Sequence, residues 1–127
     1  MKEFMLLIRS EAGAKENFSP EQHREFVSKC EVYIEKLTKQ GNLVAAQPLK
    51  KEGKMITSAG GSWKESTFAE AEEIIVGYYH IVANDLEAAI AIAKENPEFV
   101  YNNTARVEVR VIKMKEEVTG FTYPSAT

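Results

Sequence analysis

One stretch of the chain, residues 68–86, constrains the fold more than any other. It reads FAEAEEIIVGYYHIVANDL and joins an apolar run to the start of a helix. The run at residues 72–83 predicts a strand, and Asn84 with Glu87 three residues later predicts a capped helix start. A second apolar run, residues 106–112, predicts the strand that follows this helix. The second half of the chain is therefore expected to form a strand–helix–strand unit.

The first half of the chain shows the same order of elements. Residues 2–9 form a nearly continuous apolar run, which is typical of a buried strand. A helix start is predicted by Ser19, which can cap, by Pro20, which suits the first helical position, and by Gln22, which can close a capping box. The helix is expected to end near Gly41 and to pack through a stripe of side chains spaced three and four residues apart: Phe26, Val27, Cys30, Tyr33, Ile34 and Leu37.

A hairpin is expected between these two units. Residues 43–49 and 54–58 predict its two strands, and Pro48 favours a place at the edge of a sheet. Residues 59–67 then predict a loop that holds Trp63, the only tryptophan. This tryptophan either lines the mouth of a pocket or covers the sheet edge, and we favour the second interpretation.

Together these elements predict an α+β fold with the order βαββ followed by βαβ, which is the ferredoxin-like plait. In that plait both helices cover one face of an antiparallel sheet. The helix-free face is expected to carry five apolar side chains: Met5, Leu7, Tyr78, Val82 and Ile112. An apolar surface of that size predicts a partner, and a twofold homodimer that packs sheet against sheet would cover it.

Composition excludes several classes of protein. The chain has 127 residues, 44% of them hydrophobic, which suits one domain with a real core. Its net charge of −3 argues against a nucleic-acid binder, which would show a concentrated basic surface. No apolar run approaches the ~20 residues of a membrane span, and the run at residues 4–8 is shorter than the core of a signal peptide. With a single cysteine as well, we expect a cytoplasmic protein that binds neither nucleic acid nor membrane.

Four charged or titratable side chains are expected to meet on the helix-free face. Alternation along the last strand places Glu108 and Arg110 opposite the helices, and Arg9 and His80 take the same face of their own strands. Arginine can hold a carboxylate or phosphate through two parallel hydrogen bonds, and histidine can carry a proton near neutral pH. The pattern predicts a pocket for a small anionic molecule. The alternative is a salt-bridge network in the dimer interface that holds no ligand.

Two histidines are the candidate proton carriers. His80 lies in the strand, with Tyr78 beside it as a candidate ligand-binding residue. His23 lies three residues before Phe26, which places it on the sheet-facing side of the first helix. Cys30 belongs to the apolar stripe of the same helix, so we interpret it as a small packing residue. No spacing of His, Cys, Asp or Glu predicts a metal site, and we expect no cofactor.

Several pieces of the sequence resemble the YCII-related family, and more closely its DGPF-type branch. They are MKEFMLLIRSE, SPEQ, KQGNLVAAQPL, FAEAEEIIVGYYHIVANDLEAAIAIAKENP and VEVRVI, within residues 1–114. The resemblance implies a dimeric α/β barrel built from ferredoxin-like plaits. It leaves residues 115–127 as a C-terminal tail, which we interpret as a candidate dimer arm because it contains Phe121 and Tyr123.

The chain departs from that family at two places. The Asp-Gly-Pro-Phe motif of the branch reads Glu-Ser-Thr-Phe here, at residues 65–68, so the tight Gly-Pro turn is absent. The resemblance also implies a His–Asp pair, with His23 near the position of the histidine. The aspartate position before Pro97 holds Asn96, which cannot take up a proton as a carboxylate does.

We therefore predict a homodimer that binds a small polar or anionic metabolite in a cleft on the sheet face, with cofactor-free acid/base chemistry of a lyase or isomerase type. In this interpretation His80 or His23 carries the proton, and Arg9 and Arg110 hold the anion. The alternative is a non-enzymatic structural or regulatory dimer that binds a protein partner.

Overall fold

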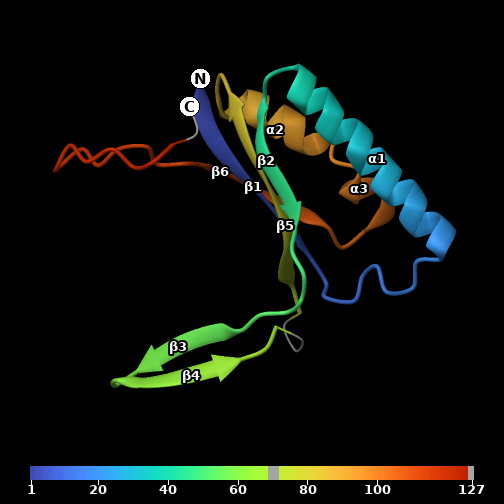
Figure 1. Ribbon diagram of the computed structural model, residues 1–127, viewed down its shortest axis with the longest axis horizontal. Helices are drawn as coiled ribbons and strands as arrows, with labels where there is room; N and C mark the ends of the chain where they lie inside the picture. The colour runs from blue at the N-terminus through green and yellow to red at the C-terminus, as the bar shows by residue number, and fades with distance from the viewer. Residues whose placement is uncertain (69–71, 126–127) are drawn as a thin grey trace.

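The structure, a computed structural model, describes residues 1–68 and 72–125 of the chain. Its elements are β1 (Lys2–Ser10), α1 (Pro20–Lys39), β2 (Leu43–Pro48), β3 (Met55–Ala59), β4 (Ser62–Ser66), β5 (Ile74–Ala83), α2 (Leu86–Lys94), α3 (Glu98–Tyr101) and β6 (Arg106–Val111). Strands β2, β5, β1 and β6 form an antiparallel sheet in that order, with the helices on one face (Figure 1). This confirms the α+β class and is compatible with the ferredoxin-like plait.

The helix starts follow from local sequence signals. The capping box of α1 is confirmed, because the Ser19 hydroxyl accepts from the Gln22 amide and the Gln22 side chain accepts from the Ser19 amide. The prediction that Asn84 caps α2 is wrong by one residue. Asp85 has the extended backbone of a cap, and its carboxylate accepts from the Ala88 amide at 2.8 Å. The segment after α2, which reads as a polar loop, begins with the single helical turn of α3.

The core lies between the sheet and the helices. Its members alternate along β1 and β5 as the sequence predicts, and α1 and α2 supply the opposite wall; they are Phe4, Leu6, Ile8, Tyr79, Ile81, Ala83, Tyr33, Leu37, Ala89 and Ala93. Alternation leaves Met5, Leu7 and Tyr78 half-buried on the helix-free face. Val82, expected to be exposed on that face, is buried.

The predicted hairpin between β2 and β3 is wrong. β2 pairs with β5 at the edge of the main sheet, where Pro48 is tolerated, and β3 pairs with β4 in a separate two-stranded sheet. The turn between β3 and β4 is Gly60-Gly61, and both glycines have positive φ, as a two-residue hairpin turn requires. Residues 59–67, expected as a loop, therefore hold β4, and Trp63 lies on that strand.

Two hairpins extend away from the helices (Figure 1). One is β3–β4, which carries Trp63 with 76% of its surface exposed. The other is the C-terminal tail, where Lys115 and Thr122 form a bridge and the exposed rings of Phe121 and Tyr123 pack edge to face. The tail then returns to the start of β1, because the Ser125 hydroxyl bonds the Glu3 carboxylate. Within the described part of the chain, no helix combines the length and apolarity that crossing a membrane requires.

Candidate functional site

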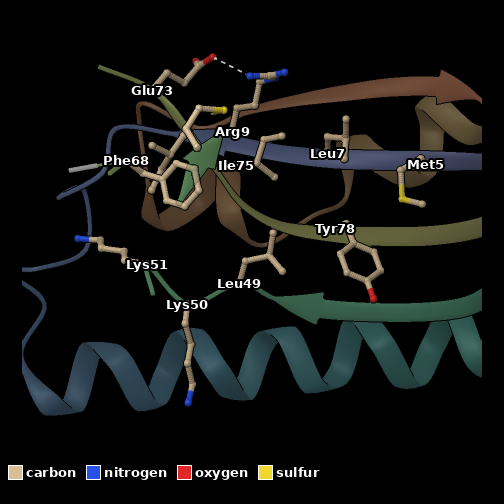
Figure 2. A pocket seen from close by; sticks show the side chains of 12 residues that line it. Met5, Leu7, Arg9, Leu49, Lys50, Lys51, Phe68, Glu73, Ile75 and Tyr78 are labelled. Carbon is tan, nitrogen blue, oxygen red and sulfur yellow. Dashed lines mark ion pairs between the residues drawn. The ribbon is translucent and has the colours of Figure 1, made fainter. Parts of the chain in front are cut away.

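A cavity of about 640 Å³ lies on the helix-free face of the sheet (Figure 2). Its apolar lining comes from β1, from β5 and from the segments just before and just after the β3–β4 hairpin: Met5, Leu7, Leu49, Phe68, Ile75 and Tyr78. Charged side chains stand at its margins, with Arg9 and Glu73 on one side and Lys50 and Lys51 extending outward on the other. An apolar cavity with a few charged groups at its rim is the usual form of a small-molecule site.

Strand alternation builds the floor of this cavity. Met5 and Leu7 sit between core positions of β1, so they point to the helix-free face while their neighbours are buried under the helices. Tyr78 lies directly across from Leu7 on β5 and takes the same face. Tyr78 and Arg9, both predicted as ligand-binding residues, line this cavity, and their binding of a ligand stays a prediction.

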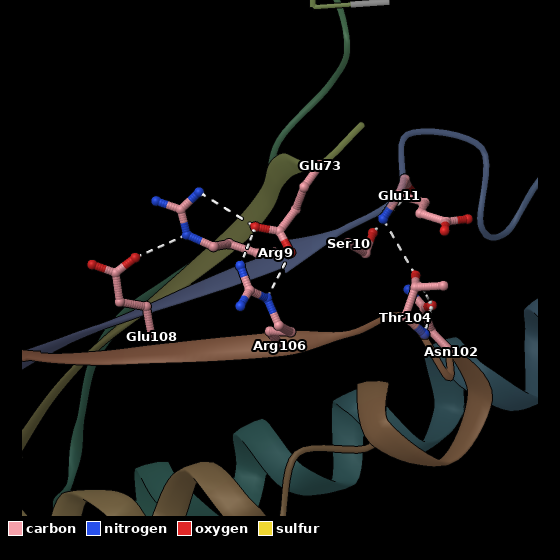
Figure 3. A network of polar contacts seen from close by, with 8 residues as sticks. All are labelled: Arg9, Ser10, Glu11, Glu73, Asn102, Thr104, Arg106 and Glu108. Carbon is pink, nitrogen blue, oxygen red and sulfur yellow. Dashed lines mark hydrogen bonds and ion pairs between the residues drawn. The ribbon is translucent and has the colours of Figure 1, made fainter. Parts of the chain in front are cut away.

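Arg9 belongs to a network of charges at one end of the cavity (Figure 3). Its Nε donates to Glu108 at 2.8 Å, and its guanidinium lies 3.8 Å from Glu73. Arg106 holds the same Glu73 through two hydrogen bonds of 2.7 and 2.8 Å. Arg110 reaches Glu108 at 3.4 Å and is otherwise exposed. The structure thus joins Arg9, Glu108 and Arg110, as predicted, and adds Glu73 and Arg106, which the sequence analysis missed.

These contacts change the acidity of both carboxylates. The hydrogen bond from Arg9 lowers the pKa of Glu108, and the hydrogen bonds from Arg106 lower the pKa of Glu73. The positive charge of Arg9 is consequently shared between two carboxylates of its own chain. A ligand anion at Arg9 would have to compete with them.

The acid stability of the protein should report this network. A carboxylate whose pKa is lowered in the folded state stabilises the fold above its ordinary pKa, here 4.5, and this stabilisation disappears as the pH falls through the lowered value. We expect Arg9→Gln to lower the melting temperature at pH 7, and we expect the difference from wild type to shrink as the pH falls below 4.5. Thermal unfolding across this range checks the prediction.

The control for this experiment is Lys39→Gln, which removes an exposed ion pair with Glu35. That variant should melt with wild type at every pH, because exposed pairs contribute little. A melting-temperature gap between wild type and Arg9→Gln that stays constant down to pH 3 would contradict the assignment.

His80 lies outside the lining of the cavity and does not join the arginine network. It follows Tyr78 on the same face of β5, and its Nε2 lies 2.6 Å from Oε1 of Glu3. Glu3 is buried, and its other oxygen accepts from the Ser125 hydroxyl. The sequence analysis missed Glu3, although its odd position on β1 places it on the face of Met5 and Leu7.

His23 lines a second cavity, of about 540 Å³, between α1 and strands β2 and β5. Its place in this lining agrees with the predicted sheet-facing side of α1, and its side chain is exposed at the start of that helix. Cys30 and the buried Glu98 line the same cavity, and burial with the nearby Glu98 charge raises the pKa of the Cys30 thiol. His80 is not among the residues that line this cavity, so the structure does not bring His23 and His80 together.

Two other positions that the sequence singles out lie outside the lining of both cavities. Trp63 is not among the residues that line either cavity, and it stands exposed on β4. Asn96 is buried, and its side-chain oxygen accepts from the Glu98 amide at 2.8 Å, which fixes the start of α3. Its side-chain nitrogen has no partner in the described part of the chain.

Metal ligands do not gather in the part of the chain that the structure describes. No three His, Cys, Asp or Glu side chains of residues 1–68 and 72–125 come together in a group able to hold an ion.

The sequence matches the YCII-related domain over residues 2–115. The chain belongs to this family. The YCII-related domain therefore spans the whole four-stranded sheet, the helices and the β3–β4 hairpin. Among curated proteins, none matches the sequence. The assignment to the DGPF-type branch remains a prediction, and of the branch motif only Phe68, at the cavity wall, is retained.

Proposed function

We propose that this YCII-related protein is a cytoplasmic homodimer that binds a small metabolite with an apolar body and one anionic group. The site is the cavity on the helix-free face, and the apolar floor with a basic rim is the observation that supports it. If the bound molecule reacts, the chemistry is cofactor-free proton transfer of an isomerase or lyase type, because His80 stands two residues beyond Tyr78 on the same face of β5.

The apolar floor sets the body of the ligand. Met5, Leu7 and Tyr78 present carbon atoms to the cavity from two neighbouring strands, and Ile75 and Leu49 extend this surface toward the rim. Each Å² of apolar ligand surface that leaves water there contributes roughly 25 cal/mol to binding. A purely polar metabolite would gain nothing from such a floor.

The rim charges set the anionic group. The residues that line the cavity include three cations, Arg9, Lys50 and Lys51. They include one carboxylate, Glu73, so the rim carries a net positive charge. Lys51 is occupied by Glu16 at 2.9 Å, whereas Lys50 has no ion-pair partner in the described part of the chain. Lys50 is consequently the cation that a ligand carboxylate can engage without displacing another group.

A thermal-shift comparison of phenylacetate with its neutral amide, phenylacetamide, tests this function. The two molecules share an apolar ring and differ in charge, so we expect phenylacetate to stabilise the protein more. At ~100 times its dissociation constant a ligand adds ~2.7 kcal/mol, which raises the melting temperature of a domain this size by several degrees. In Lys50→Gln the advantage of phenylacetate over phenylacetamide should disappear.

Lys39→Gln again serves as the control, since it removes a cation at the far end of α1. It should leave the advantage of phenylacetate intact. Equal shifts with both molecules in wild type would exclude an anion-selective site, and the absence of any shift would exclude an apolar one.

The second candidate is a structural or regulatory dimer without a ligand. The arginine network supports it, because Nε of Arg9 already donates a hydrogen bond to Glu108 at 2.8 Å. In that case both probes leave the melting temperature unchanged, and Arg9→Gln lowers it by weakening the fold or the dimer alone.

A further inference from the structure

We infer that Glu3 and His80 form a carboxylate–imidazole dyad that takes up a proton, through Nδ1 of His80, from a carbonyl compound bound on the helix-free face. This inference rests on the proposed function for its ligand. To that function it adds the reacting group, which is Nδ1 of His80, and the positioning residue, which is Glu3. It also adds the class of substrate, a carbonyl compound.

The contact between the two side chains is built into the sheet. Glu3 is only 2% exposed, and a carboxylate that is buried without partners is costly. Here Oε2 accepts from the Ser125 hydroxyl of the returning tail, and Oε1 lies 2.6 Å from Nε2 of His80. Because one oxygen is held by the tail, the other is fixed in place toward the imidazole.

This contact decides which ring nitrogen is basic. An ionised carboxylate only accepts hydrogen bonds, so in the neutral ring the proton must sit on Nε2. Nδ1 then carries the lone pair, and it has no hydrogen-bond partner in the described part of the chain. Glu3 also stabilises the imidazolium that forms when Nδ1 takes up a proton, which is how a carboxylate assists a catalytic histidine.

The strand register places the imidazole beside the cavity. His80 pairs with Met5 on one side and with Ala45 on the other, and Ala45 offers only a methyl group. Met5 lines the cavity, so a ligand that fills it to that end lies next to the imidazole. Arg110 pairs with Met5 from the opposite strand, which places His80 and Arg110 on either side of the same residue.

These positions suit proton abstraction from carbon next to a carbonyl group. The proton moves to Nδ1 of His80, and the electron pair of the broken C–H bond becomes the enolate of the ligand. The Arg110 side chain is 69% exposed, and among the described residues its one ion pair is the 3.4 Å contact with Glu108, so its guanidinium can turn to the enolate oxygen. Return of the same proton to carbon or oxygen completes an isomerisation, and no other reactant is needed.

The competing explanation is that the Glu3–His80 pair only anchors the tail. A structural pair keeps the same hydrogen bond and the same tautomer, but it requires no contact with ligand. The two explanations therefore differ in the effect of the ring on a bound carbonyl acid, whereas the tautomer tests only whether the pair exists.

The first part of the test needs no ligand. The chain contains only two histidines, so long-range ¹H–¹⁵N spectra of the full-length protein, with His23→Gln for assignment, resolve the ring of His80. We expect a neutral ring at high pH with the proton on Nε2, and a mixture of tautomers in Glu3→Gln. A ring that carries its proton on Nδ1 in wild type overturns the dyad, whether or not any ligand binds.

The second part uses phenylpyruvate, which combines an aromatic ring, a carboxylate and an acidic C–H next to a carbonyl group. Deuterium incorporation at its C3 in D₂O, followed by NMR, should be faster with wild type. In His80→Gln the rate of deuterium incorporation should fall roughly 100-fold toward the rate in buffer, because a positioned acid or base usually accelerates a reaction by about that factor. Glutamine is chosen because its amide can still donate to Glu3 and preserve the fold. His23→Gln should exchange as wild type does.

Thermal shift with phenylpyruvate on the same samples separates the two proposals. Binding without faster exchange, or equal exchange in wild type and His80→Gln, overturns the dyad and leaves the binding site standing. Absence of binding overturns the proposed function, and the tautomer then decides whether the dyad exists.

Discussion

Leu7→Glu is expected to convert the proposed homodimer into a monomer. Leu7 lies on the central strand β1, half-buried, on the face that no helix covers. If two sheets pack face to face, a carboxylate at this position is buried without a partner, which costs several kcal/mol. Since every 1.4 kcal/mol is tenfold in affinity, the dissociation constant of the dimer should rise roughly 100-fold or more. Sedimentation equilibrium measures this directly.

The matched control for this experiment is Val32→Glu. Val32 is an exposed apolar residue of α1, with 63% of its surface in solvent. Helix α1 covers the other face of the sheet (Figure 1). This variant should remain dimeric with unchanged affinity. Circular dichroism should show both variants folded, because Leu7 is only half-buried within one chain. A Leu7→Glu protein that sediments as wild type would show that the helix-free face is not the interface.

The parts of the fold that the sequence predicts correctly depend on neighbouring residues. The Ser19–Gln22 capping box needs only four residues, and Pro48 lies at a sheet edge because it lacks an amide hydrogen. Alternation along β5 places Tyr79 and Ile81 in the core and Tyr78 on the other face, as expected. Each of these outcomes follows from covalent geometry or from a period of two residues.

Pairing between distant segments was harder to predict. Two turns compete to close a hairpin after β2, one near Gly53 and one at Gly60-Gly61, and local composition suits both. The structure uses the second, because the positive φ of Gly60 and Gly61 gives the twist that a tight hairpin needs. Strand β2 is then free to pair with β5, which completes the main sheet. The Gly-Gly pair was the signal that the sequence analysis could have used.

In the candidate site, too, contacts between distant segments were harder to predict than the face that each side chain takes. The face of Arg9, Glu108 and Arg110 follows from alternation, so their convergence was predictable. Glu73 was not expected, because nothing local to it indicates that Arg106 and Arg9 lie within reach. Glu3 was missed for a different reason: a charged residue before an apolar run is ordinarily read as the exposed end of a strand. Its burial depends on the tail, which returns from 122 residues away.

The other large effect is expected at a pair on the opposite side of the sheet, where Lys15→Met should destabilise the protein by about 2–3 kcal/mol. Lys15 lies in the loop before α1, and its ammonium reaches the two oxygens of Glu98 at 2.6 and 2.9 Å. The Glu98 side chain is only 8% exposed, so removing the lysine leaves a buried charge whose remaining side-chain partner, among the described residues, is Asn102 at 3.4 Å. Breaking a fully buried pair costs about 3–5 kcal/mol, and the 27% exposure of Lys15 reduces that figure.

An exposed ion pair of the same residue types provides the control. Lys51 reaches Glu16 at 2.9 Å, but both side chains are more than half exposed. Lys51→Met should therefore change the free energy of unfolding by less than about 1 kcal/mol. Urea unfolding of wild type and the two variants compares the pairs at one pH.

The double variant Lys15→Met/Glu98→Gln distinguishes the lost pair from lost packing. Lys15 also lies 4.4 Å from the centre of the Phe26 ring, and methionine keeps most of that contact. With the carboxylate neutralised, the double variant should recover most of the stability lost by Lys15→Met, because no unpaired charge remains buried. Equal losses in Lys15→Met and in the double variant would assign the effect to packing on Phe26.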